Sequence, residues 1–572
     1  MTLNGWLQIA AYFVVLILLV KPLGLYLSRV YQDQPTLLRP VLLPVERFIY
    51  RLAGVRPEEE MPWSTYAIAM LIFNLIGIIF LFLLQRFQGI LPLNPQHLGA
   101  VAPDLALNTA ISFVTNTNWQ NYAGESTLSY LTQMLGLTVQ NFLSAATGMA
   151  ILMAFIRGFT RHNTRLLGNF WADLTRGVLY ILLPLSIGLA LVFVSQGVVQ
   201  TLSPSVMTHN PKSAPQTIAL GPVASQLAIQ NLGTNGGGFY NANAAHPFEN
   251  PNALTDFLIV LAFTALPAAL TYTFGQMAGD TRQGWALLAV MLIFLLAFTG
   301  LAYASEAAGN PRLAALGVDQ TASVTQPGGN MEGKEVRLGI ARSALFATTT
   351  TATSTGTVDA MHDSFTPLGG MVPLVMMLLG EVILGGVGSG LYGMLAFVIV
   401  AVFVAGLMVG RTPEYLGKKI EIFEMKMAAL LILIMPLTVL GLTALAVVTA
   451  PGQSAVYNPG PHGFSEILYA FTSQGNNNGS AFAGLAGNSV FYNLTGALAM
   501  IIGRFGLAIP TLALAGSLAA KKKVPAGPGT LSTTSGLFMG WLAGVIILVG
   551  ALNFVPALAL GPIIEQLILI GK

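Results

Sequence analysis

The sequence predicts an all-α polytopic membrane protein with ten transmembrane helices. Hydrophobic residues make up 54% of the 572 residues and charged residues only 9%, whereas about a quarter of the residues in a soluble domain are charged. Long apolar runs recur along the chain, and shorter apolar segments that end in polar loops lie between alternate runs. Lipid is therefore the expected main solvent, and helices are the expected spanning elements.

Ten apolar runs approach or exceed the ~20 residues that cross the hydrocarbon core of a bilayer. We expect spanning helices at about 3–21, 64–85, 127–155, 177–199, 253–276, 284–305, 371–409, 426–449, 488–516 and 536–560. The run 371–409 is too long for one straight helix and contains GGVGSGLYG at 385–393. We expect it to be broken or kinked, with the break covered by protein or facing water.

The positions of Lys and Arg predict the orientation. The connections 21–62, 157–176, 282, 411–426 and 521–523 hold 18 of the 26 basic residues. The alternate loops hold Arg86, Lys212, Arg312, Lys334, Arg337 and Arg342. By the positive-inside rule the first set is cytoplasmic, and both termini are expected on the outer face.

Four shorter apolar segments lie between alternate spans, too short to cross a bilayer. They cover Asp104–Val114, Pro222–Leu232, about Val336–Thr350 and Phe464–Ser473. Each leads into a polar stretch, namely TNTNWQ (115–120), GTNGGG (233–238), TSTGT (353–357) or TSQGNNNGS (472–480). With Asn118, Gly236, Gly356 and Gly479 taken as equivalent, these stretches are 118, 120 and 123 residues apart.

A fixed period with matching hydropathy indicates internal repeats. We therefore predict four helix–pore-helix–filter-loop–helix repeats around one pore, plus an extra N-terminal and an extra C-terminal helix. Four unrelated outer loops are the alternative, because Asn, Gly, Ser and Thr are ordinary turn residues. The expected units are 1–62, with the first helix and a cytoplasmic loop; repeats 63–156, 173–277, 283–410 and 424–520; and the last helix at 530–572.

The four loops carry backbone carbonyls and Asn, Ser and Thr oxygens without fixed negative charge. Such oxygens replace the water shell of a dehydrated cation. They are hard ligands suited to alkali ions, whereas Ca²⁺ normally recruits carboxylates. The residues thus indicate a potassium-type selectivity filter built from one chain.

Six longer motifs carry a specific resemblance: TNTNWQNYAGESTLSYLTQMLGLTVQNFLSAATG (115–148), LGTNGGGFYNANAAHPFENP (232–251), HDSFTPLGGMVP (362–373), GEVILGGVGSGLYGM (380–394), GRTPEYLGKK (410–419) and NPGPHGFSE (458–466). Over essentially its whole length the chain resembles the potassium-binding, channel-like subunit of bacterial Kdp-type potassium pumps. That family belongs to a superfamily of K⁺ transporters with four pore repeats. The resemblance implies a subunit of the bacterial inner membrane that takes up external K⁺ and passes it through an intramembrane tunnel to a separate P-type ATPase subunit.

The resemblance also implies the filter residues. They are Asn116, Thr117 and Asn118; Thr234, Asn235 and Gly236; Ser354, Thr355 and Gly356; and Asn477, Asn478 and Gly479, flanked by Gln120, Gly237 and Asn476. Position 355 is Thr where some relatives carry Cys, and either residue offers a backbone carbonyl.

Two ionisable residues, Glu381 and Arg504, lie in apolar surroundings. An ionisable group inside a span is a functional hypothesis, and we favour a role in a gate or tunnel over a structural ion pair between the two. The segment 385–393, which contains Gly385, Gly386, Gly388 and Gly390, is expected to form a plug below the third filter loop. The pair His362-Asp363 could suggest a metal site or a proton relay, but a hydrogen-bonded role in the outer vestibule is favoured, as for His246 and His462.

The chain has no GxxxxGK[ST] motif, no DKTGT-type phosphorylation segment and no cysteine. It is therefore not expected to hydrolyse ATP by itself, and thiolate metal sites and cysteine nucleophiles are excluded. The net charge of +3 is too small to suggest a nucleic acid. We expect K⁺ as the transported ion, no organic cofactor, ATP used by the partner, and contacts with lipids and with accessory single-span subunits. The alternatives are a self-sufficient K⁺ channel or cation-coupled symporter, and a non-transporting membrane assembly subunit.

Overall fold

The computed structural model describes residues 1–209, 214–525 and 530–571. The expected basic residue Lys212 and the last residue of the C-terminal unit, Lys572, lie outside this part of the chain. The helices are α1 (Leu3–Tyr31), α2 (Arg39–Ala53), α3 (Trp63–Phe87), α4 (Pro103–Val114), α5 (Gly124–Thr127), α6 (Val139–Thr160), α7 (Phe170–Arg176), α8 (Leu183–Ser195), α9 (Val223–Leu232), α10 (Ala253–Met277), α11 (Thr281–Ala307), α12 (Pro311–Ala315), α13 (Gly339–Ala352), α14 (Pro367–Leu378), α15 (Ser389–Met408), α16 (Ile422–Val448), α17 (Ala450–Gln453), α18 (Pro461–Gly475), α19 (Val490–Ala520), α20 (Gly536–Leu558) and α21 (Ile564–Leu569).

Short irregular pieces join these helices. Three π-helical turns run directly into α6, α8 and α21: η2 (Thr132–Thr138), η3 (Gly177–Leu182) and η6 (Ala559–Ile563). The 3₁₀ turns are η1 (Gln88–Ile90), η4 (Asn243–Ala245) and η5 (His362–Ser364). The strands β1 (Val206–His209) and β2 (Pro215–Ile218) pair antiparallel with Val206 opposite Ile218, and β3 (Glu414–Tyr415) pairs with β4 (Lys418–Lys419).

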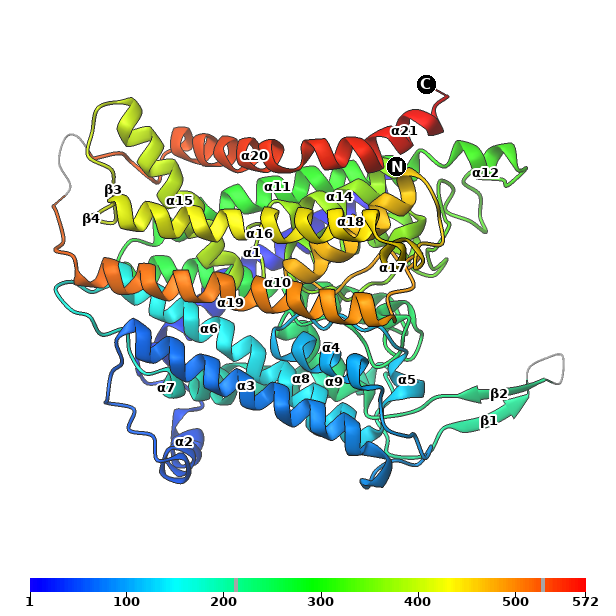
Figure 1. Cartoon of the computed structure of the whole chain (residues 1–572), viewed down its shortest axis with the longest axis horizontal. Helices are drawn as coiled ribbons and strands as arrows, with labels where there is room; N and C mark the ends of the chain where they lie inside the picture. Colours follow the sequence, from blue (N-terminus) through cyan, green and yellow to red (C-terminus); the bar gives the residue numbers. More distant parts are fainter. Residues whose placement is uncertain (210–213, 526–529, 572) are drawn as a thin grey trace.

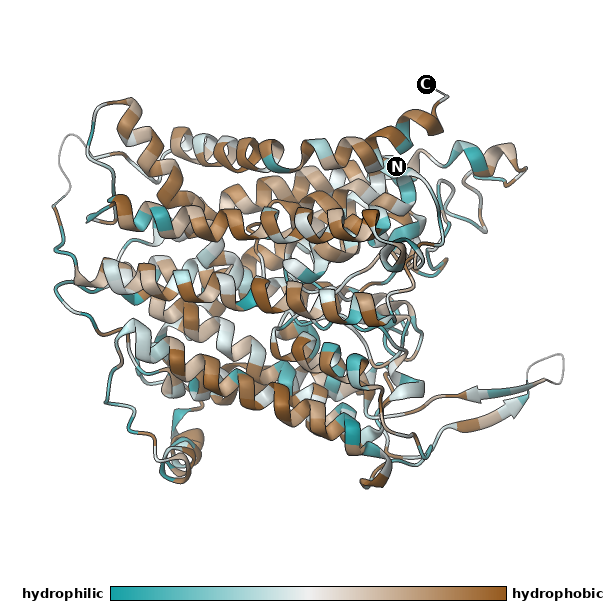
Figure 2. Cartoon of the chain, in the orientation of Figure 1, coloured by the Kyte–Doolittle hydropathy of each residue, from teal (hydrophilic) through white to brown (hydrophobic). Residues whose placement is uncertain are grey.

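Ten helical stretches of the described chain are long and apolar enough to cross a membrane, and each overlaps one of the ten predicted spans. The all-α, multi-pass prediction is therefore confirmed. Figure 1 shows these helices running side by side, with both termini and the β1–β2 hairpin at one end of the bundle and the β3–β4 hairpin at the other. Hydrophobic residues run along the lengths of the outer helices, whereas hydrophilic residues are more frequent at the bundle ends and near the short helices inside (Figure 2).

Several predicted boundaries are wrong; the fourth span, for example, covers Phe170–Ser195 instead of 177–199. The first span continues through Pro22 to Tyr31 instead of ending near residue 21. It does so because it packs on α10, where a Cβ at Gly24 would lie 2.8 Å from the Tyr272 Cβ, and the Thr273 hydroxyl donates to the Gly24 carbonyl at 3.1 Å. The third span begins at Thr132 rather than 127. The amphipathic helix α2 within the connection 21–62 has no counterpart in the prediction; Figure 1 shows it nearly end-on, across the direction of the spans.

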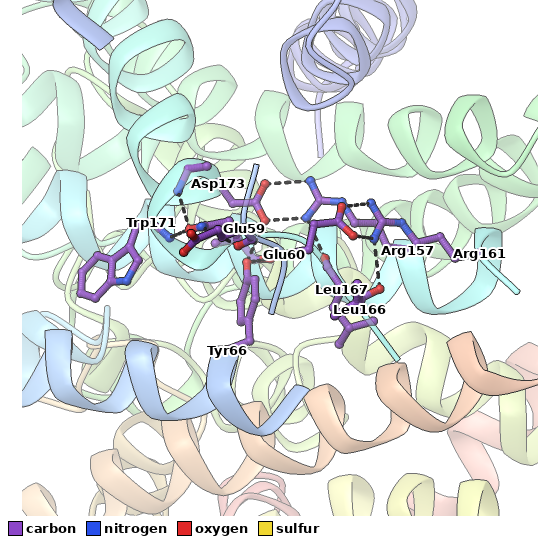
Figure 3. Close-up of polar contacts among 12 residues, drawn as sticks. Glu59, Glu60, Tyr66, Arg157, Arg161, Leu166, Leu167, Trp171 and Asp173 are labelled. Carbon is purple, nitrogen blue, oxygen red and sulfur yellow. Dashed lines mark hydrogen bonds and ion pairs between the residues drawn. The ribbon is translucent and has the colours of Figure 1, made fainter. Parts of the chain in front are cut away.

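A buried ion pair fixes the end of α6 that lies away from the termini. Arg157 on α6 and Asp173 on α7 form two bonds of 2.5 and 2.7 Å, and the Tyr66 hydroxyl donates to the same carboxylate at 2.9 Å (Figure 3). Beside them the exposed pair Arg161–Glu60 joins the two adjacent connections. This network stiffens the bundle end that carries most of the basic connections.

Candidate ion-binding site

Four short helices converge on the centre of the bundle. α4, α9, α13 and α18 are almost entirely buried, and each ends directly before one of the four polar stretches. Their C-terminal ends carry a partial negative charge from unpaired carbonyls, which favours a cation at this point. Each short helix lies between two spanning helices along the chain, as the repeat hypothesis expects; the exact limits of the repeats stay a prediction.

The backbone of the four loops follows one pattern. In each loop two residues separated by one position have a positive φ, and the residue between them does not: Asn116 and Asn118, Thr234 and Gly236, Ser354 and Gly356, Asn477 and Gly479. In the second loop Gly237, directly after Gly236, has a positive φ as well. Alternation between right- and left-handed conformations turns successive carbonyls toward the same side of the strand, a geometry rarely adopted by non-glycine residues. Rings of backbone carbonyls replace the hydration shell of K⁺ in potassium channels, and the alternating backbone of these loops is compatible with such a ring.

The loops close into a ring in chain order. A Cβ added at Gly236 would overlap the carbonyl oxygen of Thr355, one at Gly356 would overlap that of Asn478, and one at Gly479 would overlap that of Thr117. The third filter residue of one loop thus lies against the second carbonyl of the next loop, and the fourth loop meets the first. Because no side chain fits between the strands, glycine is required at these three contacts.

The contact between the first and second loops differs from the other three because it has no glycine of the first loop. The third filter residue of the first loop is Asn118, whose Nδ2 donates to the Gly236 carbonyl at 2.8 Å and to Asn141 Oδ1 at 2.9 Å. The Asn116 Nδ2 donates to the Thr234 carbonyl at 2.9 Å, and the Asn235 Nδ2 donates to Asn116 Oδ1 at 2.6 Å. Between these two loops, hydrogen bonds from side-chain amides hold the strands together, whereas the other loops are held by close backbone contact.

The asparagines of the fourth loop also act as braces. The Asn477 Nδ2 donates to the Thr117 hydroxyl at 2.9 Å, and the Asn478 Nδ2 donates to the Thr350 carbonyl at 3.0 Å. Among the described residues, the Oδ1 atoms of Asn118 and Asn235 are buried and accept no hydrogen bond. The asparagine side chains thus mainly donate hydrogen bonds that join neighbouring loops.

The three flanking residues lie at opposite ends of the ring. Gln120 exchanges two hydrogen bonds with the backbone of Gly238, at 3.0 and 3.2 Å, and a Cβ at Gly237 would lie 2.6 Å from its Oε1. Asn476 follows α18 directly, and its carbonyl accepts from the Ser354 hydroxyl at 3.2 Å. Gln120 and Gly237 follow the filter residues of their loops in the sequence and border the filter end far from the pore helices. Asn476 precedes the filter residues of its loop and borders the end nearest the pore helices.

The predicted break in the seventh span lies beneath this ring. α14 ends at Leu378 and α15 begins at Ser389, and the segment 379–388 between them is buried or nearly so. The Gly385 N–H donates to the Ala352 carbonyl and the Val387 N–H donates to the Thr234 hydroxyl, both at 2.9 Å. A Cβ at Gly386 would lie 3.2 Å from the Ser354 Cβ. The segment therefore covers the inner ends of the second and third loops.

Glycine is required in this segment by close backbone approach. At Gly388 φ is +93°, and an added Cβ would overlap the backbone of Gly148 on α6. A Cβ on Gly385 would overlap the Cα of Gly390, and a Cβ on Gly390 would overlap the Cα of Gly385. The break is thus a packed structure.

No hydrogen bond or ion pair joins Glu381 to Arg504 in the described part of the chain. Glu381 Oε1 accepts from the Asn478 Nδ2 at 2.9 Å, and Arg504 Nη2 donates to the Ser144 carbonyl at 2.6 Å. Both side chains line one cavity, which also reaches the inner filter residues Asn116, Ser354 and Asn477. From there the cavity extends between α15, α16 and α20, where Leu431, Met435, Val549 and Phe554 line it.

Comparison with known proteins assigns the family. The sequence profile described as "Potassium-transporting ATPase A subunit" matches residues 10–567. The chain belongs to this family. It is 62% identical over 576 residues to the "Potassium-transporting ATPase potassium-binding subunit" of Sorangium cellulosum, with 99% of each chain covered, and 60% identical over 600 residues to the protein of that name from Methylococcus capsulatus, with 100% of each covered. The solved structure of the potassium transporter TrkH from Vibrio parahaemolyticus is similar with a TM-score of 0.49 and 14% identity, covering 89% of this chain and 97% of that one.

Three supporting residues of this family member were missed in the sequence, namely Thr115, Thr353 and Ser144. The hydroxyls of Thr115 and Thr117 lie 2.8 Å apart and those of Thr353 and Thr355 2.7 Å apart, so each pair holds its loop from within. The T-x-T spacing in both loops is a signal that could have found them. Ser144 on α6, which donates to Asn116 Oδ1 at 2.8 Å, gives no such signal because only the closed ring brings it to the filter.

Proposed function

We propose that this chain is the potassium-binding and translocating subunit of an ATP-driven K⁺ uptake pump. The observation that carries the proposal is the ring of four loops with alternating backbone handedness. Its twelve filter residues contain no ionisable side chain, so neutral oxygens would replace the water shell of the ion. The printed names of the relatives, which are potassium-binding subunits of potassium-transporting ATPases, support the same ion.

The second part of the proposal is the path of the ion. A direct exit from the filter meets the segment 379–388, whose Gly385 N–H donates to the Ala352 carbonyl at the end of α13 and whose Val387 N–H donates to the Thr234 hydroxyl of the second loop. The cavity with Glu381 and Arg504 instead leads sideways between α15, α16 and α20. We propose that K⁺ leaves along this side route toward a separate P-type ATPase subunit, with accessory single-span subunits completing the complex. ATP is hydrolysed by the partner.

The proposed location is the inner membrane of a bacterium, with both termini on the outer face. The termini lie at one end of the bundle, while the basic connections around α2 and the β3–β4 hairpin lie at the other (Figure 1). The positive-inside rule then directs the open end of the filter outward.

The test of the function is reconstitution. The purified complex should hydrolyse ATP with K⁺ stimulation only when this chain and its ATPase partner are both present, and the two should co-purify in fixed stoichiometry. K⁺ flux through the chain alone in liposomes, without any partner, would instead establish a self-sufficient channel or symporter and refute the pump assignment.

The plug is tested by deleting residues 385–388. Proteoliposomes that contain the complex with this deletion should conduct K⁺ passively without ATP, because the direct route is then open. A deletion of 321–325, in an exposed connection, is the control and should leave the membranes tight. Tight membranes from a folded 385–388 deletion would overturn the plug.

A further inference from the structure

Three ionisable side chains gather near the outer end of the filter. Asp363 lies in η5, shortly after the third loop, and His462 and Glu466 lie on α18, the short helix before the fourth loop. One possible ligand atom from each lies within 4.8 Å of the others. A single ion could therefore contact all three.

The histidine is oriented by a fourth group. Its Nε2 lies 3.0 Å from Asp363 Oδ1, and its Nδ1 lies 2.9 Å from Glu565 Oε1 on α21. Metal-binding histidines usually present one ring nitrogen to the metal while the other donates to a carboxylate, which fixes the ring and increases its basicity. Glu565 occupies the position of such a supporting carboxylate.

Glu466 supplies an independent indication of a ligand. The residue is 0% exposed; its Oε1 accepts from the Asn458 Nδ2 at 2.7 Å, whereas its Oε2 is buried and accepts no hydrogen bond from a described side chain. A buried carboxylate oxygen without a partner costs free energy. A bound cation would remove this cost.

The space between the two carboxylates is kept open by Gly484. A Cβ at this position would lie 2.8 Å from Asp363 Oδ2 and would overlap Glu466 Oε1. Two carboxylates thus face one small volume that any other residue would fill.

The charges around the cluster leave room for a cation. Three carboxylates, those of Asp363, Glu466 and Glu565, surround His462 alone. The Lys334 ammonium group, which lies over the Phe365 ring, is engaged by Glu306, with its Nζ 2.7 Å from Glu306 Oε2. One imidazole nitrogen with carboxylate oxygens is the donor set of Zn²⁺ and related first-row ions, whereas K⁺ and Ca²⁺ favour oxygen alone.

We infer that Asp363, His462 and Glu466 form a binding site for a divalent transition-metal ion of the Zn²⁺ class, with Glu565 holding the histidine ring. In the metal-free site an Nε2–H donates to Asp363, and the ion takes the place of this hydrogen. The bound ion joins η5, α18 and α21.

The site is connected to the filter. The Tyr469 hydroxyl, on the same helix as His462, lies 2.9 Å from His362 Nδ1 and 2.9 Å from the Ser480 hydroxyl, and Ser480 donates to Asn478 Oδ1 at 2.6 Å. A metal ion that stiffens the short helix therefore restrains the fourth filter loop. This consequence, slower K⁺ uptake with the metal bound, rests on the proposed function; the metal site itself does not.

The test measures metal binding on the full complex purified without a histidine tag. Zn²⁺ titration calorimetry, and the visible absorption of Co²⁺ as a substitute, should report one ion per chain with micromolar or tighter affinity. Glu466→Gln should weaken binding at least 10-fold, and Glu565→Gln by 10- to 100-fold as for other supporting carboxylates. The control His246→Asn, which changes another histidine of the outer loops, should bind as the wild type does.

Two outcomes would overturn the inference. One is a folded wild-type complex that binds no Zn²⁺ or Co²⁺ at 100 μM; the other is binding that Glu466→Gln leaves unchanged. If the variants do not fold, X-ray absorption of the Zn²⁺-loaded wild type decides, because the site requires a single imidazole nitrogen among oxygen donors. Wild-type metal binding without an effect on K⁺ uptake would uphold the site and remove only the coupling to the filter.

Discussion

Replacing Gly356 by alanine is the sharpest test of the ring. Gly356 has a φ of +86°, and a Cβ there would lie 2.7 Å from the Ser480 nitrogen and 2.8 Å from the Asn478 carbonyl carbon. Ordinary contacts of this kind begin at 3.4 Å. Because the Cβ would also overlap the Asn478 carbonyl oxygen, the fourth loop must retreat by more than roughly 0.7 Å, which moves a filter carbonyl away from the ion.

Two costs determine the size of the effect. A non-glycine residue in the left-handed region costs about 1–2 kcal/mol, and forcing an extra methyl group into a packed site costs about 1–3 kcal/mol. Much of this sum of about 2–5 kcal/mol must be met each time the filter adopts its ion-binding shape. At about 1.4 kcal/mol per factor of ten, K⁺ affinity should fall by at least roughly 30-fold.

Gly279→Ala is the matched control. Gly279 has a similar φ of +79°, but no atom lies within 4 Å of an added Cβ, and it is located in the turn between α10 and α11. It carries the backbone strain without the carbonyl displacement, so stability should fall by about 1 kcal/mol and K⁺ affinity should not change. The assay is the K⁺ dependence of ATP hydrolysis by the complex, with Rb⁺ and Na⁺ as competitors. Unchanged K⁺ affinity and discrimination in folded Gly356→Ala would refute the ring.

Three further predictions concern buried carboxyl groups. Burial raises the pKa of Glu249 from 4.5 to about 8, so the folded state loses stability as the pH rises from about 4.5 to 8 and the buried carboxyl ionises. Thermal unfolding of Glu249→Gln should show a smaller loss of stability over this window than the wild type does. Identical pH profiles of the two proteins would contradict the assignment. Asp173→Asn leaves the buried Arg157 without its partner and should cost about 3–5 kcal/mol in denaturant unfolding, whereas a loss below 1 kcal/mol would show that the pair is not a structural brace. Glu381→Gln should lower maximal K⁺ uptake at least 10-fold and alter half-saturation by less than 3-fold, because the group lies beyond the filter; a large change in half-saturation alone would contradict that placement.

The spans could be predicted because length and apolarity decide them locally. The half-helices and polar loops were visible for the same reason, since a 10–14-residue apolar segment cannot cross the hydrocarbon core. The end of the first helix was mispredicted because Pro22 is a helix-breaking signal in isolation, while the packing of Gly24 against α10 continues the helix. Such a contact between segments about 250 residues apart leaves no local trace.

The filter residues were predicted from their motifs, but the role of their asparagines could be assigned only in part. Whether Asn116 and Asn477 present an oxygen to the ion or an N–H to a neighbouring loop depends on how the ring closes. Glu381 and Arg504 were expected either to pair or to line a tunnel, and both lie on one cavity without a mutual bond. Composition marks an ionisable group as exceptional, but only three-dimensional structure identifies its partner.

One residue links the filter to the side cavity. Asn478 offers its backbone carbonyl to the ring, where it lies against Gly356, while its side-chain Nδ2 donates to both the Thr350 carbonyl and Glu381 Oε1. Displacing the fourth loop therefore strains a hydrogen bond to the carboxylate that the ion would meet next. Since Glu381 lies in the segment 379–388, which covers the inner end of the filter, binding and onward movement would share one mechanical connection on the proposed path. Among the four described loops, the fourth is the one whose asparagine donates a hydrogen bond to Glu381, so this link belongs to a single loop of an asymmetric ring.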